Sequence, residues 1–256
     1  MKATGLEHAL ERRMLIRARP ETVFRYFTDA SAWAAWWGVG STIDPRPGGR
    51  VFVRHPGGAE AGGEVIEIDP PRRIVFSYGY ATGRPIPIGA SRVTITLTPE
   101  RHGTRLDLHH ALADREVRDQ HVQGWRYQLS LFSNVVANEL LGDPAASVDA
   151  WFTAWSEPDP ARRARVLGAI VSEGVRFRDR FSHVEGRADL DPHLDAVHVH
   201  MPGLKVERAG APRHCQGTVL ADWIARGADG AERGRGTAVF QFDADARIED
   251  VVGFWS

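Results

Sequence analysis

The chain has 256 residues, of which 43% are hydrophobic and 25% charged, and its formal net charge is −1. This length suits two domains of ordinary size, and the composition is typical of folded globular proteins. The balanced charge argues against a nucleic-acid partner. Cys215 is the only cysteine, which excludes a disulfide framework and a thiolate metal cluster.

No apolar signal segment opens the sequence, and no run approaches 18 apolar residues. We therefore expect a cytoplasmic protein that does not interact with a membrane.

The first half of the chain predicts a strand, helices, an antiparallel meander and one long helix. "ALERRMLIRA" reads as a strand, and Pro20 opens a helix because proline is preorganised for the first helical position. Turn signals rich in glycine and proline separate five further strands. These strands are 50–54, 63–68, 73–80, 92–98 and 104–110.

Residues 114–141 then predict a single helix, because apolar residues recur every three to four positions from Trp125 to Leu140. A helix of 28 residues is about 42 Å long and can cover a whole sheet. A curved antiparallel sheet around a long C-terminal helix leaves room for an elongated cavity between them.

The segment "LLGDPAAS" at 140–147 marks the predicted boundary, so we expect domains at 1–141 and 147–256. In the second domain two helices come first, and Asp159 caps the second of them with Pro160 in its first turn. The expected elements after them are a strand at 174–179, a helix near 187–199 and strands at 203–209, 214–226, 234–243 and 246–255. This order predicts an α+β cone with a bent antiparallel sheet.

Five segments of the first domain resemble the SRPBCC (START/Bet v-like helix-grip) superfamily, specifically homologues of the activator of heat-shock-protein-90 ATPase. They are "RPETVFRYFTDASAWAAWWG", "DPRPGGRV", "GGEVIEIDPPRRIVFSY", "RVTITLTPERHGTRLDLHH" and "HVQGWRYQLSLF". The resemblance implies an α+β helix-grip fold that encloses a small-molecule cavity.

The second domain is similar to the SnoaL-like branch of the nuclear-transport-factor-two superfamily. The segments that carry this similarity are "VDAWFTAWSEPD", "VSEGVRFRDRFSHVEGRADLDPHL" and "GRGTAVFQFDADARIEDVVGFW". It implies a cone with its own cavity and a homodimer that forms through this domain.

The tryptophans of "WAAWWG" are the first candidate site in the helix-grip domain. Trp33 is predicted to be core, whereas Trp36 and Trp37 either face a ligand or seal the end of the barrel. Alternation in "TRLDLHH" places His110 on the inner face, either as a polar contact for a ligand or as a core histidine with satisfied hydrogen bonds. The predicted ligand-binding residues are Trp36, Trp37, Phe76, Tyr78, His110, Trp125, Leu129 and Phe132.

In the second domain the resemblance places Asp179 where related ketosteroid isomerases keep their general base. A carboxylate in an apolar cone can abstract an acidic C–H proton. The family's oxyanion partners do not carry over, because their positions match Trp151 and Ala238. Further ligand contacts are predicted at Trp151, Trp155, His183 and Trp223.

No metal site and no cofactor are predicted. The histidines of "DPHLDAVHVHMPG" do not have zinc-motif spacing, and no dinucleotide, phosphate-loop or hydrolase motif is present.

Three functions remain open from the sequence. The favoured one is binding of a small hydrophobic or aromatic molecule in one or both cavities. The alternative is a cofactor-independent enzyme of the polyketide cyclase or isomerase kind, with Asp179 as base and His183 or His198 assisting. A co-chaperone that activates the heat-shock ATPase is the least favoured, because family members with that activity carry an additional N-terminal domain.

Overall fold

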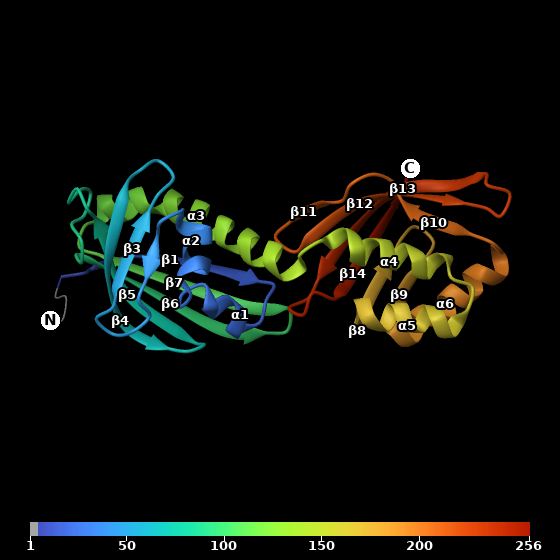
Figure 1. Cartoon of the computed structure of the whole chain (residues 1–256), viewed down its shortest axis with the longest axis horizontal. Helices are drawn as coiled ribbons and strands as arrows, with labels where there is room; N and C mark the ends of the chain where they lie inside the picture. The colour runs from blue at the N-terminus through green and yellow to red at the C-terminus, as the bar shows by residue number, and fades with distance from the viewer. Residues whose placement is uncertain (1–4) are drawn as a thin grey trace. The chain divides into compact units, whose positions relative to one another are not determined.

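The computed structural model describes residues 5–256 and divides into two compact units, Met1–Val136 and Ala137–Ser256. Both units combine helices with a sheet of their own (Figure 1). The division falls inside the long helix α3 (Arg115–Leu141), a few residues before the Gly142–Pro144 segment. No helix within residues 5–256 is both long and apolar enough to cross a lipid bilayer.

The first unit is a seven-stranded antiparallel sheet with the strand order β1-β7-β6-β5-β4-β3-β2. Helix α3 runs along this sheet (Figure 1). The elements before α3 are β1 (His8–Ile16), α1 (Pro20–Arg25), α2 (Ala30–Trp37), β2 (Thr42–Ile43), β3 (Arg50–Arg54), β4 (Glu60–Asp69), β5 (Arg73–Tyr80), β6 (Ser91–Glu100) and β7 (Gly103–Leu112). The predicted α+β helix-grip fold is confirmed.

Side-chain alternation in β7 follows the sequence pattern. Leu106, Leu108 and His110 are buried, whereas Asp107 and His109 point outward. Leu106 pairs with Met14 of β1, and Leu108 pairs with Ile95 of β6. One face of the sheet is therefore apolar and is covered by the buried face of α3, which includes Trp125, Leu129, Phe132 and Val136.

The second unit is a cone in which helices pack on a bent sheet of order β10-β12-β13-β14-β8-β9. The pair β14–β8 is parallel and the other pairs are antiparallel. Its elements are α4 (Pro144–Ser156), α5 (Pro160–Ile170), β8 (Val171–Arg178), β9 (His183–Glu185), α6 (Arg187–His200), β10 (Lys205–Arg208), β11 (Arg213–Cys215), β12 (Thr218–Arg226), β13 (Glu232–Phe242) and β14 (Ile248–Trp255). The predicted cone is confirmed.

One strand prediction in this unit was wrong. Residues 214–226 form two strands, because Gln216 and Gly217 adopt positive φ angles of 49° and 82° and turn the chain back on itself. Cys215 and Thr218 then face each other across the turn. Two consecutive positive φ angles are the signature of a two-residue hairpin turn.

Candidate functional site

The second unit encloses a cavity of about 100 Å³ between its helices and its sheet. Aromatic side chains make up much of its wall: Trp151, Phe152, Trp155, Phe177, Trp223 and Trp255. Asp179 and Arg233 are the two charged residues in the wall. The cavity is therefore apolar with few polar contacts, which is typical of small-molecule sites.

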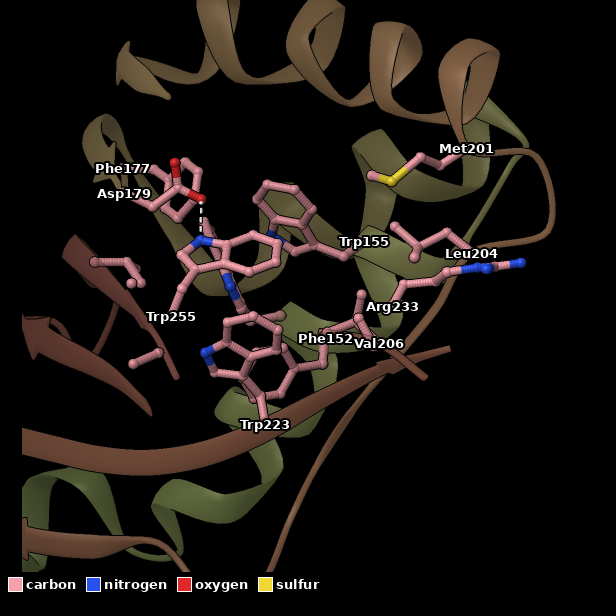
Figure 2. Close-up of a pocket in the computed structure, with 15 residues that line it drawn as sticks. Phe152, Trp155, Phe177, Asp179, Met201, Leu204, Val206, Trp223, Arg233 and Trp255 are labelled. Atoms are coloured by element: carbon pink, nitrogen blue, oxygen red, sulfur yellow. Dashed lines mark hydrogen bonds between the residues drawn. The ribbon is translucent and has the colours of Figure 1, made fainter. Parts of the chain in front are cut away.

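Asp179 follows the end of β8, where the chain turns toward β9. Its Oδ2 accepts a hydrogen bond from Trp255 Nε1 at 3.0 Å, the contact dashed in Figure 2. Its Oδ1 accepts from the backbone N–H of Phe181 at 2.8 Å. The two donors fix the orientation of the carboxylate, and each oxygen keeps a lone pair for a ligand because a carboxylate has about four acceptor sites.

Trp255 reaches the cavity because of its place on β14. Val251, Gly253 and Trp255 alternate along this strand, and all three line the cavity. The Trp255 indole packs edge-on against Trp223, with ring centroids 4.9 Å apart. Trp255 was not predicted as a site residue, although the alternation in "VVGFW" carried the signal.

The structure brings four of the five residues predicted in this domain into one wall. Trp151, Trp155, Trp223 and Asp179 line the cavity, and so does Ala238, where the related isomerases keep an acidic group. His183 does not: it is exposed on β9, and its Nε2 lies 3.3 Å from the Glu185 carboxylate.

Trp155 adds a hydrogen-bond donor to this site. Its Nε1 is buried, and no group within residues 5–256 accepts its proton. The wall therefore includes one fixed carboxylate, the Arg233 guanidinium and one indole whose N–H has no partner in the described part of the chain.

The first unit contains a second cavity, of about 130 Å³. Aromatic and imidazole rings from α2, β5, α3 and the end of β3 surround it. These rings belong to Trp37, His55, Tyr78, Tyr80, His121 and Trp125. Its wall contains no charged side chain among the described residues.

The three tryptophans of α2 occupy different environments. Trp33 Nε1 donates to the carbonyl of Phe52 at 3.1 Å, and Trp36 Nε1 donates to the carbonyl of Tyr26 at 3.3 Å. Both side chains are buried in the core. Trp37 alone of the three lines the cavity, and its buried Nε1 has no acceptor in the described part of the chain.

His110 lies behind the cavity wall. Ser91 Oγ donates to the Tyr78 carbonyl at 2.8 Å, so it accepts from His110 Nε2 at 2.7 Å. His110 Nδ1 in turn accepts from Trp125 Nε1 at 2.9 Å. Burial lowers the pKa of His110 to about 3, so the ring is neutral and both nitrogens are satisfied.

Three of the other residues predicted in the first unit belong to the core. Phe76, Leu129 and Phe132 are buried and do not line the cavity, whereas Tyr78 and Trp125 do. Sequence reasoning missed several wall residues on α3 and after β3. These are His55, His121 and Gln128.

The position of His121 was detectable in the sequence. His121, Trp125 and Gln128 are spaced four and three residues apart, so they share one face of the helix. Nothing in the sequence of β3 placed His55 against Tyr78, because that contact joins strands that are distant in the chain.

Tyr78 and His55 form a neutral pair at the wall. Tyr78 Oη and His55 Nε2 are 3.2 Å apart. Burial raises the pKa of Tyr78 and lowers the pKa of His55, since removal from water disfavours the charged form of each.

Comparison with known proteins agrees with this two-part architecture. Residues 17–137 match the family described as activator of Hsp90 ATPase homolog 1-like protein. The match covers most of the first unit and agrees with the resemblance that its motifs predicted. No curated protein gives a significant match.

Several solved structures are similar to parts of the chain. A proposed isomerase of the SnoaL-like family from Agrobacterium tumefaciens is 27% identical, with a TM-score of 0.42, over 43% of this chain and 95% of its own. CalU16 from Micromonospora echinospora is 26% identical, with a TM-score of 0.43, over 52% of this chain and 79% of its own. The Aha1 dimer from Colwellia psychrerythraea is 16% identical, with a TM-score of 0.42, over 48% of this chain and 90% of its own.

Proposed function

We propose that the second unit binds a small, largely apolar molecule about the size of one aromatic ring, with a hydrogen-bond donor that faces Asp179. The size follows from the cavity of about 100 Å³. An apolar cavity of about 150 Å³ accommodates benzene, so this cavity has room for at most one ring. A hydroxyl or amine on the ring would meet the carboxylate, and the rest of the ring would contact the tryptophans.

The fixed Asp179 carboxylate carries this proposal. Trp255 and the Phe181 backbone hold it in a largely apolar wall, where the other charged residue, Arg233, is paired with Asp229. A partly buried carboxylate is favourable only where hydrogen-bond donors surround it. The two protein donors leave acceptor capacity on each oxygen, which a ligand hydroxyl or amine would use.

A second candidate is an isomerase-type enzyme in which Asp179 removes a proton from the bound molecule. The free N–H of Trp155 favours it, because an indole donor in the same cavity can stabilise an enolate oxygen. The residues at the positions of the related isomerases' oxyanion donors do not help, since Trp151 is packed in the core and Ala238 has no polar group. We therefore rank binding first.

Titration with phenol and with toluene tests the binding proposal. The two probes are similar in size, and only phenol can donate to Asp179. We expect the wild-type protein to bind phenol about tenfold more tightly, and Asp179→Ala to lose this preference, since hydrogen bonds to charged groups have that magnitude.

Asp222→Ala is the matched control, because Asp222 is an exposed carboxylate in the same unit that bonds to Thr237. This variant should keep the preference for phenol. Equal affinity for the two probes in the wild-type protein would refute the proposal. Asp179→Asn separates binding from catalysis: it keeps an acceptor oxygen but removes the base, so an enzyme would retain binding and lose turnover.

A further inference from the structure

We infer that the first unit contains a separate binding site for a planar aromatic carbonyl compound. This site goes beyond the function proposed for the second unit, because no residue lines both cavities. The inference rests on which polar atoms of the wall have a hydrogen-bond partner within the protein and which have none.

Aromatic side chains of the wall pack against one another in an arrangement that suits a flat ring. Trp37 stacks on Tyr78, with ring centroids 6.3 Å apart and planes inclined by 23°. Trp125 meets Trp37 edge-on at 5.6 Å. Offset and edge-on contacts are the arrangements that aromatic rings prefer, so a planar aromatic ligand would extend a cluster that already exists.

Trp37 supplies the unsatisfied donor. Its side chain is only 3% exposed, and no acceptor for Nε1 exists within residues 5–256. Trp33 and Trp36, on the same helix, both donate to backbone carbonyls. Buried donors are nearly always paired, so an orphan N–H in a cavity wall points to an acceptor that arrives with a ligand.

His121 supplies the matching acceptor. Its Nδ1 lies 2.7 Å from the carbonyl of Val117, and because a carbonyl only accepts, Nδ1 carries the proton. When the ring is neutral, Nε2 therefore carries a lone pair. That atom is buried and has no partner in the described part of the chain.

Several other polar groups in this wall have partners. Trp125 Nε1 donates to His110, Tyr78 Oη lies against His55, and Gln128 Nε2 donates to the carbonyl of Trp36. Within residues 5–256, Trp37 Nε1 and His121 Nε2 are the buried side-chain atoms of this wall that have no partner, and no Asp, Glu, Lys or Arg lines it. A neutral ligand with a carbonyl oxygen for Trp37 and a hydroxyl for His121 satisfies both.

Three ligands of similar size separate the contribution of the carbonyl group from that of the hydroxyl group. 4-Hydroxyacetophenone carries both groups, 4-ethylphenol lacks the carbonyl, and acetophenone lacks the hydroxyl. We expect the first to bind the wild-type protein about tenfold more tightly than either of the others, the effect of one hydrogen bond in a buried site. Affinities are measured by calorimetric titration of the full chain.

Two substitutions of tryptophan assign the effect to one cavity. Trp37→Phe keeps an aromatic ring and removes the N–H, so 4-hydroxyacetophenone and 4-ethylphenol should bind this variant equally. Trp36→Phe removes an indole N–H that is already paired with the Tyr26 carbonyl and should leave the preference intact.

A third variant tests the location if Trp37→Phe fails to fold. Gly124 lines the cavity, and a Cβ atom there has no heavy atom within 4 Å outside its own helix, so Gly124→Phe is a way to place a ring beside the wall. We expect it to weaken binding of 4-hydroxyacetophenone at least tenfold, with Gly124→Ala as control. Unchanged affinity in Gly124→Phe, or equal binding of 4-hydroxyacetophenone and 4-ethylphenol by the wild-type protein, would overturn the inference. Neither result affects the phenol test at Asp179.

Discussion

His110 supports the wall of the first cavity without lining it itself. It donates to Ser91 and accepts from Trp125, and that acceptor role requires a neutral ring. The Trp125 indole, which lines the cavity, is therefore oriented through His110. The same arrangement makes the stability of the first unit depend on pH.

His110 should lower the stability of the protein in mild acid. Burial, with smaller contributions from the charges of His121 and His109, lowers its folded-state pKa to about 3, from a usual value of 6.5. Below pH 6.5 the unfolded chain takes up a proton that the folded chain does not. The stabilisation is therefore complete above pH 6.5 and is lost as the pH falls toward 3. Between pH 7 and pH 5 we expect the free energy of unfolding to decrease by about 2 kcal/mol on account of this residue.

Urea denaturation of the wild-type protein and of His110→Gln at both pH values measures this effect. Glutamine does not titrate, so the variant should show a smaller decrease than the wild-type protein. Other histidines, such as His55, contribute equally to both proteins and cancel in the comparison. If the two decreases are the same, His110 does not take up a proton on unfolding, and the assignment is wrong.

The inward direction of His110 could be predicted from the sequence, but its role could not. Alternation in β7 fixes the side of the sheet toward which the ring points. Its partners Ser91 and Trp125 lie 19 and 15 residues away, so only the folded structure shows that both nitrogens are occupied. The unpaired N–H of Trp37 could not be predicted for the same reason. Helix α2 carries three similar tryptophans, and only tertiary contacts decide which indole N–H has no carbonyl to accept its proton.

At the scale of elements the sequence was more informative. Periodicity predicted α3 and the β5–β7 meander closely, because a buried face imposes a regular pattern over many residues. Asp159 caps α5 as predicted, accepting from the N–H groups of Ala161 and Arg162. The hairpin at Gln216 was missed, since its turn depends on two backbone angles rather than on a hydrophobic pattern.

The glycine in the middle of α3 provides a test at the same scale. Gly124 lies in a helix interior, where glycine is less favourable than alanine by about 1 kcal/mol, and an added Cβ meets no neighbour outside its own helix. We expect Gly124→Ala to raise the free energy of unfolding by about 1 kcal/mol. Thermal or chemical denaturation measures the change. A destabilised variant would show that the cavity wall needs the space at this position.

At the scale of the whole molecule, the two cavities differ in charge. The wall in the second unit includes Asp179 and Arg233, whereas no Asp, Glu, Lys or Arg within residues 5–256 lines the cavity of the first. Each cavity is built from the side chains of one unit. A phenol hydroxyl should therefore bind more tightly in the second unit, because hydrogen bonds to charged groups are stronger than those to neutral ones.

This separation predicts that the two sites act independently. Substitutions that share no partner usually change free energies additively, to within about 0.5 kcal/mol. We therefore expect Trp37→Phe to alter the affinity for 4-hydroxyacetophenone equally whether residue 255 is tryptophan or phenylalanine. The reciprocal holds for phenol and Trp255→Phe, which loses a donor that holds Asp179. Titration of the wild-type protein, the two single variants and the double variant with both ligands completes a double-mutant cycle. A coupling free energy above about 1 kcal/mol would contradict independence, because it would mean that each site senses the state of the other.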